Sequence, residues 1–199
     1  MEVKVALMKK ILLMRHSIPE SSDLPTALIP LSEKGKALAR SRKELFSDVD
    51  KCYASPYCRA FETAKLLFAG PVIVKDQLHE RLVGDAQAGF WLRQYQDHDF
   101  CCPGGESLNM VRVRMKDVIN EILQELADGE TALVVSHATA ICSYLLNYCE
   151  IEVADAASKS RIIKCHDQEI LNGKINPTDY FVLEYVNNDI SAITFRTLP

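Results

Sequence analysis

The sequence places cationic and imidazole side chains directly after short apolar runs. Arg15 and His16 follow the apolar run 9–14, and His137 follows the run 131–135. A guanidinium can bind phosphate oxygens in a bidentate manner, and a neutral imidazole can act as a nucleophile or as a base. The small residues after His137 begin a predicted helix, whose first N–H groups attract anions. These residue types at these positions point to chemistry on a phosphorylated ligand.

Two further side chains fit the same chemistry. Arg59 falls in the first turn of a helix predicted to open at Pro56, where its guanidinium can make bidentate bonds to phosphate. Glu80 follows a predicted strand and lies between His79 and Arg81. Each residue alone has an ordinary structural explanation, such as a hydrogen-bonded core histidine, a solvated helix arginine or a surface carboxylate. The combination is what favours a functional site.

Alternating strands and helices are predicted to position these residues. Short apolar runs predict strands over 9–14, 51–55, 72–74 and 131–135. Helices are predicted to begin at Ser32 and Pro56, and to run over 108–126 and 141–148. In the first of these helices, Leu38 and Leu45 are predicted to share one face. The tail, 180–186 and 190–196, is typical of a hairpin, whereas 150–179 is more polar and gives no clear pattern.

This alternation predicts a largely parallel sheet with helices on both faces and antiparallel strands added from the tail. Ligands bind beyond the carboxyl ends of the strands in such sheets. Four places along the chain qualify: Arg15–His16, 55–59, 79–81 and 136–137.

Composition limits the classes of protein and partner. The 199 residues are 48% hydrophobic and 25% charged, which predicts one domain over 1–199. The formal net charge of −4 gives no general basic field for nucleic acid or an anionic membrane, and no apolar run is long enough to span a bilayer. A cytoplasmic location is therefore expected. Met8 is a plausible alternative start, which would make the first seven residues an extension.

Cysteine usage favours reduced thiols. The seven cysteines are an odd number without a repeated CxxC pattern, which is not typical of a disulfide framework. Cys101–Cys102 and Cys165–His166 lack the usual spacing of zinc ligands, so no metal site is predicted. A metal or redox protein based on these cysteines is the weakest alternative.

Six segments, in order over about 9–140, resemble motifs of the histidine phosphatase superfamily, which includes the cofactor-dependent phosphoglycerate mutases. The segments are 12–17, 31–35, 54–64, 78–84, 103–107 and 134–137. The longest and most specific match is 54–64, which is similar to a Ser-x-x-x-Arg-Ala-x-Glu-Thr-Ala segment. The first segment carries Arg15 and His16, and the last carries His137.

The resemblance implies a three-layer α/β/α sandwich with a mostly parallel central sheet, as in phosphoglycerate mutases, and a short cap insertion at about 84–105. It implies a phosphoric monoester hydrolase that forms a phosphohistidine on His16, without metal or cofactor. Arg15, Arg59 and His137 would bind the phosphoryl oxygens, and Glu80 would act as acid and then base. The implied partner is a small phosphorylated substrate.

Three departures keep alternatives open. Ser17 and Ala138–Thr139 replace glycines that follow the two histidines in the family, so the pocket is expected to tighten without closing. Ser22 stands where the mutases carry a phosphate-binding asparagine, and it is a weaker substrate-binding candidate. A mutase-type phosphotransferase, disfavoured by Ser22 and the short chain, is the enzymatic alternative, and a non-catalytic phospholigand-binding protein on the same fold is the other. The oligomeric state is not predicted.

Overall fold

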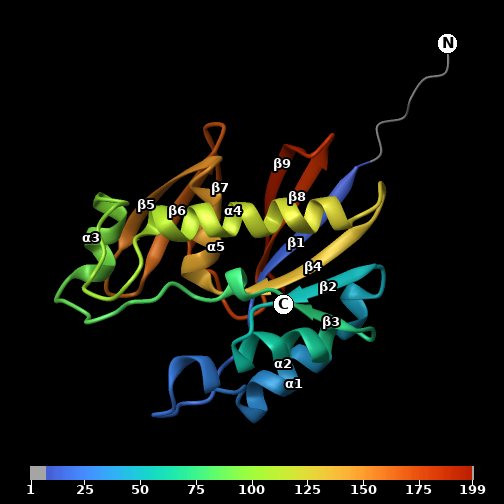
Figure 1. Cartoon of the computed structure of the whole chain (residues 1–199), viewed down its shortest axis with the longest axis horizontal. Coiled ribbons are helices and arrows are strands. Elements are labelled where there is room, and N and C mark those ends of the chain that lie inside the picture. Colours follow the sequence, from blue (N-terminus) through green and yellow to red (C-terminus); the bar gives the residue numbers. More distant parts are fainter. Residues whose placement is uncertain (1–7, 199) are drawn as a thin grey trace.

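The computed structural model describes residues 8–198, and its centre is a six-stranded sheet with the strand order β3-β2-β4-β1-β8-β9 (Figure 1). The possible extension before Met8 lies outside the described residues. The strands are β1 (Lys9–Arg15), β2 (Lys51–Ala54), β3 (Val72–Val74), β4 (Thr131–Ser136), β8 (Tyr180–Val186) and β9 (Asp189–Arg196). β3, β2, β4 and β1 are parallel, whereas β8 pairs antiparallel with β1 and β9 pairs antiparallel with β8. The predicted parallel sheet with a tail hairpin is confirmed.

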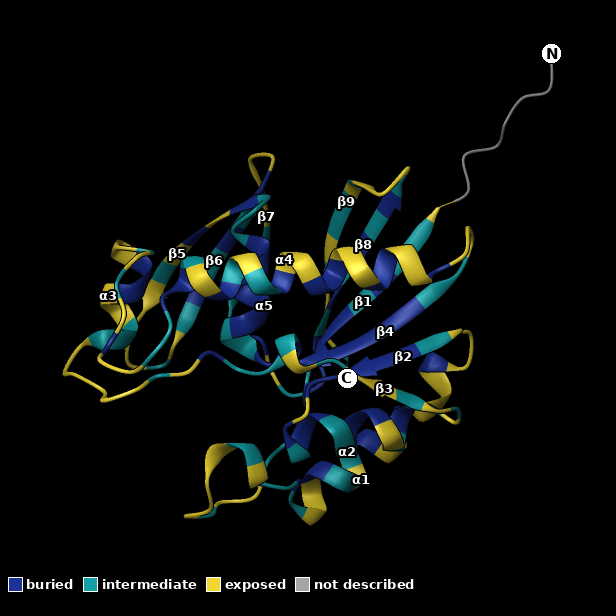
Figure 2. Ribbon diagram, viewed as in Figure 1, coloured by how far each residue is buried: buried dark blue, intermediate teal, exposed yellow. Residues whose placement is uncertain are grey.

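Helices cover both faces of this sheet. They are α1 (Glu33–Ser41), α2 (Cys58–Leu67), α3 (Phe90–Gln96), α4 (Leu108–Glu125) and α5 (Ala138–Leu145), with short 3-10 turns at Thr26–Leu28, Lys43–Phe46 and Asp76–Leu78. Buried side chains of α1 and α2 form one cluster with the sheet, and those of α4 and α5 form another. Figure 2 shows the sheet buried between these layers. The predicted three-layer α/β/α fold is confirmed.

The helix boundaries follow local signals with one clear error. Ser32 caps α1, since its hydroxyl accepts a hydrogen bond from the Gly35 N–H at 3.0 Å. The prediction that Leu45 shares a face of this helix is wrong, because α1 ends at Ser41 and Leu45 lies in the following 3-10 turn, 61% exposed. α5 begins at Ala138, with only His137 between it and β4, so it starts at the small residues expected to open a helix and before the apolar run 141–148.

The segment between Gly84 and Pro103 leaves the fold and returns to the same point. Gly84 has φ +69°, and a Cβ there would lie 2.2 Å from the Pro103 carbonyl oxygen. Asp85 N–H donates to that oxygen at 2.9 Å, which joins the two ends. The segment contains α3, so the stretch predicted to be a cap carries a helix of its own.

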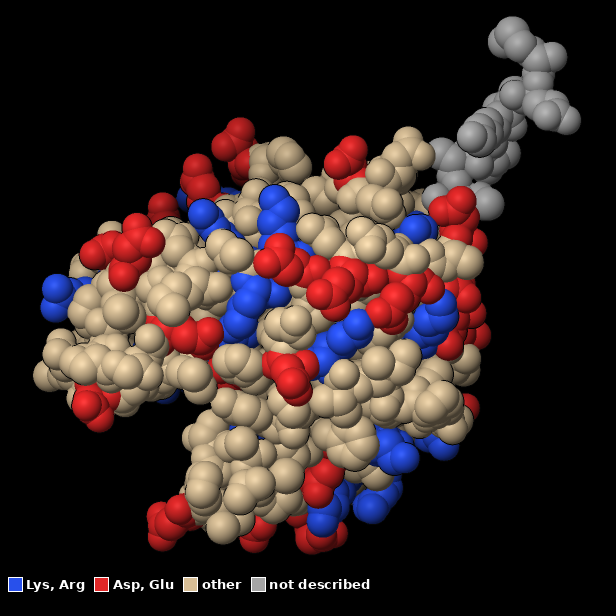
Figure 3. Space-filling view, in the orientation of Figure 1, with Lys and Arg blue, Asp and Glu red and all other residues tan. Residues whose placement is uncertain are grey.

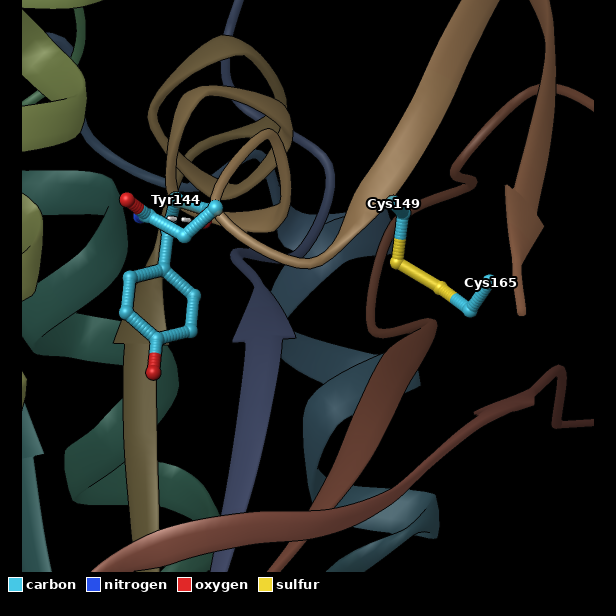
Figure 4. The surroundings of a disulfide bond; sticks show 4 residues. Tyr144, Cys149 and Cys165 are labelled. Atoms are coloured by element: carbon cyan, nitrogen blue, oxygen red, sulfur yellow. Dashed lines mark hydrogen bonds between the residues drawn. A yellow bond between two sulfur atoms is a disulfide. The ribbon is translucent and has the colours of Figure 1, made fainter.

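The polar region 150–179 forms a second sheet that sequence patterns did not predict. Its strands are β5 (Cys149–Asp155), β6 (Ser160–Cys165) and β7 (Gln168–Gly173), all antiparallel. Cys149 and Cys165 lie directly opposite each other on β5 and β6, with Cα atoms 4.4 Å apart, and form a disulfide (Figure 4). The expectation of reduced thiols is thus wrong for this pair, because strand pairing and not sequence spacing brings it together. The other five cysteines are free.

Charges of both signs alternate on the face shown in Figure 3. Along α4, Lys75 pairs with Glu125 at 2.7 Å and with Glu121 at 3.4 Å. Over residues 8–198, no helix is long and apolar enough to cross a membrane.

Candidate active site

The carboxyl ends of β1 and β4 bring the two predicted histidines together. The strands run in register, with Arg15 opposite Ser136, so that His16 and His137 leave the sheet side by side. The His16 N–H donates to the Ser136 carbonyl at 2.9 Å, and the centres of the two imidazole rings lie 5.0 Å apart. The edge chosen from the sequence is therefore where these side chains meet.

The contacts of His16 leave one ring nitrogen with a lone pair. Nδ1 lies 2.6 Å from the Ser17 carbonyl oxygen, which can only accept, so Nδ1 carries the hydrogen. Nε2 then accepts a hydrogen bond from Arg59 Nε at 3.1 Å. Burial lowers the pKa of His16 to about 3, with the Arg59 charge as the next cause. Burial therefore contributes more to the lowered pKa of His16 than the neighbouring guanidiniums do.

His137 is fully buried beside His16. Its Nε2 lies 2.8 Å from the Ser55 hydroxyl, and its Nδ1 has no hydrogen-bond partner. Burial is the main reason why its pKa lies well below the usual value for histidine, and His16 and Arg59 lower that pKa further. The ring of Tyr57, which the sequence did not single out, packs edge-on with its centre 5.1 Å from the His137 ring.

Arg15 and Arg59 are held by backbone carbonyls and not by acids. Arg15 donates to the Ile175 carbonyl oxygen, and its Nε is buried without a partner. Arg59 donates to the Thr26 carbonyl oxygen besides its contact with His16. No ion pair recorded among residues 8–198 includes either guanidinium. Both therefore keep a full positive charge beside the histidines for an anion to meet.

Glu80 lies at the N-terminus of α5. Its carboxylate accepts hydrogen bonds from the N–H groups of Arg81 at 2.8 Å, Ala140 at 2.9 Å and Thr139 at 3.2 Å. It lines the same cavity as Arg15. The N–H groups fix the orientation of the carboxylate relative to that cavity.

The segment that carries Glu80 is braced by an ion pair. Arg114 donates to the carbonyl oxygens of Gln77 at 2.6 Å and His79 at 3.0 Å, and forms a two-point pair with Glu106 at 2.8 and 2.9 Å. Glu106 also accepts a hydrogen bond from the Leu82 N–H at 2.9 Å. Because it holds both Arg114 and this backbone, Glu106 is a positioning residue.

Ser17 and Ser22, the two serines singled out from the sequence, have different surroundings. Ser17 is fully buried, and its hydroxyl donates to the Gly35 carbonyl at 2.8 Å, toward α1. Its side chain is not among those that line the cavity beside Glu80. The Ser22 hydroxyl accepts from the Leu24 N–H at 3.1 Å in the loop before α1, and its substrate-binding role stays a prediction.

Sequence patterns missed part of the lining of the cavity beside Glu80. The cavity has a volume of about 380 Å³, and its lining includes Lys159, Arg161 and Lys174 from the second sheet and its loops. The region 150–179 was not assigned to strands, so nothing directed attention to these cations. Within residues 8–198, no three His, Cys, Asp or Glu side chains are grouped so as to hold a metal ion.

Comparison with known families finds one match that covers most of the chain. The profile of the histidine phosphatase superfamily (branch 1) matches residues 11–166. No curated protein matches the sequence significantly.

Solved structures share the fold at low identity. A mycobacterial glucosyl-3-phosphoglycerate phosphatase has a TM-score of 0.70 at 20% identity, over 95% of this chain and 96% of that one. A phosphoglycerate mutase from Bacillus anthracis has a TM-score of 0.67 at 17% identity, over 97% and 93%. A putative alpha-ribazole-5'-P phosphatase from Escherichia coli has a TM-score of 0.65 at 18% identity, over 96% and 95%. At these identities the likeness concerns the fold.

Proposed function

The chain belongs to the histidine phosphatase superfamily, and on that basis we propose that it hydrolyses phosphomonoesters through a phosphohistidine formed on His16. The observation that carries the proposal is the state of the His16 ring. Its Nδ1 hydrogen is committed to the Ser17 carbonyl, and its low pKa keeps Nε2 unprotonated at neutral pH. A nitrogen with a free electron pair among cations is what attack on a phosphoryl group needs.

In the first step, Nε2 of His16 forms a bond to phosphorus as the bond from phosphorus to the ester oxygen breaks. Glu80 gives its proton to that oxygen, and the alcohol leaves. Arg59, which donates to Nε2 in the free site, moves to a phosphoryl oxygen. Arg15 binds a second phosphoryl oxygen. His137, whose Nδ1 has no hydrogen-bond partner in the protein, also binds the phosphoryl group.

In the second step, water attacks phosphorus and the bond to His16 breaks. Glu80 takes the proton of the water, which returns it to its starting state, and inorganic phosphate leaves. Arginines and histidines stabilise the charge of the phosphoryl group in both steps. The mechanism therefore requires no metal ion and no cofactor.

The substrate and surroundings follow from the same features. A cavity of about 380 Å³ suits a small phosphorylated molecule, and the relatives named for phosphatase activity act on such molecules. The mixed charges of the surface give nucleic acid no basic area on the face seen in Figure 3. A cytoplasmic location fits the five free cysteines, and the Cys149–Cys165 disulfide is the feature that argues against it.

The decisive experiment is an assay of phosphomonoester hydrolysis in the presence of a chelator. Wild type should turn over p-nitrophenyl phosphate, and rapid acid-free quenching with mass analysis should show an acid-labile adduct of one phosphoryl group. His16→Asn should lose both the turnover and the adduct. His166→Asn, which changes an exposed histidine, is the matched control and should retain them. Undiminished turnover in His16→Asn would remove the proposed nucleophile.

Glu80 is tested by the acidity of the leaving group. Glu80→Gln should slow an alkyl phosphate much more than p-nitrophenyl phosphate, because the nitrophenolate leaves without a proton. An equal loss on both substrates would remove Glu80 from the acid role.

A further inference from the structure

The cavity beside Glu80 extends past the groups proposed to bind the phosphoryl group and reaches the second sheet. Its charged lining consists of Arg15, Glu80, Arg81, Lys159, Arg161 and Lys174. Five basic side chains thus face one acidic side chain, an excess of four positive charges. A phosphomonoester dianion carries two negative charges, so it leaves half of that excess unbalanced.

Arg161 is the best-fixed cation that the second sheet contributes to this cavity. It is only 4% exposed, and its Nε donates to the Tyr95 hydroxyl at 2.8 Å. Its guanidinium lies over the rings of Trp91 and Tyr95, with its central carbon 5.0 and 5.4 Å from their centres. Cation–π contacts of this kind hold the side chain in place without neutralising it.

Arg81 lies in the same lining and is also incompletely satisfied. It is 4% exposed, donates to the Glu106 carbonyl at 3.1 Å, and lies over the ring of Phe90. Its Nη2 is buried without a hydrogen-bond partner, as is Oε1 of Gln94, which lines the cavity too. Buried donors and acceptors without partners are unusual in proteins, and these two lie where a ligand in the cavity could bond to them.

No acid among the described residues forms an ion pair with these guanidiniums, and the charge of Glu80, which acts on both of them, acts on Arg15 and Arg59 as well. None of the ion pairs recorded within residues 8–198 includes Arg81 or Arg161. Lys159 and Lys174 are exposed and stand at the rim of the cavity, beside the buried Arg161. A buried cation without a carboxylate is costly, and an anionic ligand group is what would balance it.

We propose that the second sheet supplies a binding site for a second anionic group, so that the preferred substrate is a small phosphomonoester whose leaving group also carries a carboxylate or a phosphate. Arg161 binds this group with Lys159 and Lys174, while the rings of Phe90 and Trp91 contact the part of the molecule between the two anions. The inference rests on the proposed function, since it takes the reacting phosphoryl group to lie between Arg15 and Glu80. It makes residues 159–174 the specificity-determining part of the chain.

The test compares three substrates that differ at the far end. Glycerol 3-phosphate has a neutral end, 3-phosphoglycerate has a carboxylate there, and propane-1,3-diol bisphosphate has a phosphate. Wild type should have a kcat/KM at least about tenfold higher for one of the two-anion substrates than for glycerol 3-phosphate, as one charge-assisted contact provides. Which of the two is preferred distinguishes carboxylate from phosphate recognition.

Variants then locate the second site. Arg161→Gln should reduce that preference roughly tenfold to a hundredfold. Lys159→Gln and Lys174→Gln, at exposed positions that tolerate change, should reduce it less, and they keep the test valid if Arg161→Gln fails to fold. Lys164→Gln removes a charge from the same strand as Arg161, outside this cavity, and should leave the preference as in wild type. A preference that survives in all of the Arg161, Lys159 and Lys174 variants overturns the proposal.

Binding without turnover separates this proposal from the proposed reaction. Isothermal titration calorimetry of the same three compounds against His16→Asn measures the preference for a second anion directly. Tighter binding of a two-anion compound supports the second anion site, whether or not wild type hydrolyses any of the compounds. Absence of hydrolysis would overturn only the proposed reaction. Equal affinities for all three compounds overturn the second site even if hydrolysis is confirmed.

Discussion

The stability of the protein should depend on pH through His16. In the unfolded chain His16 takes up a proton near pH 6.5, whereas in the folded protein burial and Arg59 lower its pKa to about 3. Between these values the unfolded state binds more protons, so the free energy of unfolding falls as the pH falls. The stability that neutral His16 contributes is fully present above pH 6.5 and is lost progressively down to about pH 3.

The magnitude follows from linkage. For one group with these two pKa values, lowering the pH from 7 to 5 costs about 2 kcal/mol of unfolding free energy. His137, whose pKa is also lowered by burial, adds a loss of the same sign. The carboxylates with lowered pKa, such as Glu106, contribute mainly below pH 4.5, outside this window.

The assay is urea unfolding at pH 7, 6 and 5, with extrapolation to water at each pH. His16→Asn removes the titrating ring, so its stability should fall by about 2 kcal/mol less than that of wild type between pH 7 and pH 5. His166→Asn changes an exposed histidine and should keep the wild-type pH dependence. Equal pH dependence of wild type and His16→Asn would refute the reasoning, because His16 would then titrate alike in the folded and unfolded states.

Three further outcomes are expected. Gly35→Ala should destabilise by more than about 2 kcal/mol in urea unfolding, because the new Cβ would lie 2.1 Å from a carbonyl oxygen of the loop before α1. Arg114→Lys should lower kcat/KM roughly tenfold or more by loosening the segment that carries Glu80, and a change under twofold would contradict the bracing role. Thiol titration in denaturant should find five thiols without reductant and seven with it, and reduction of the Cys149–Cys165 disulfide should cost about 3 kcal/mol of stability. Seven thiols before reduction would show that the pair is reduced.

The elements with strong local signals could be predicted from the sequence. Apolar runs marked β1 and β4, and Ser32 marked the start of α1. Because the carboxyl ends of parallel strands lie at one edge of a sheet, the strand positions predicted that His16 and His137 share that edge, and the structure brings their rings together. The strand order that makes β1 and β4 neighbours was not predicted, and the catalytic roles of these residues stay predictions.

Predictions failed where contacts depend on partners distant in the sequence. Strands β5 and β6 do alternate buried with more exposed side chains, but they lie in a polar stretch of the chain, and β7 exposes most of its side chains, so the three were not recognised as a sheet. The disulfide partner of Cys149 and the aromatic partners of Arg161 are fixed by that sheet's pairing and by its packing on α3. Neither could be read from spacing along the chain.

The buried guanidiniums that are proposed to bind the substrate also lower the stability of the free protein, because their burial carries a desolvation penalty. Arg15, Arg59, Arg81 and Arg161 are all buried or nearly so, and none of them is in an ion pair recorded within residues 8–198. The fold bears their desolvation and leaves one nitrogen each of Arg15 and Arg81 without a hydrogen bond. An anion that enters the cavity relieves both penalties, so affinity for the ligand and cost to the free protein arise from the same side chains. Arg161 is far along the chain from the proposed nucleophile, and it is held by Tyr95 in the predicted cap. In the proposed site, substrate preference can therefore change in the second sheet and the cap without altering His16, because His16 lies at the end of β1 and does not line this cavity.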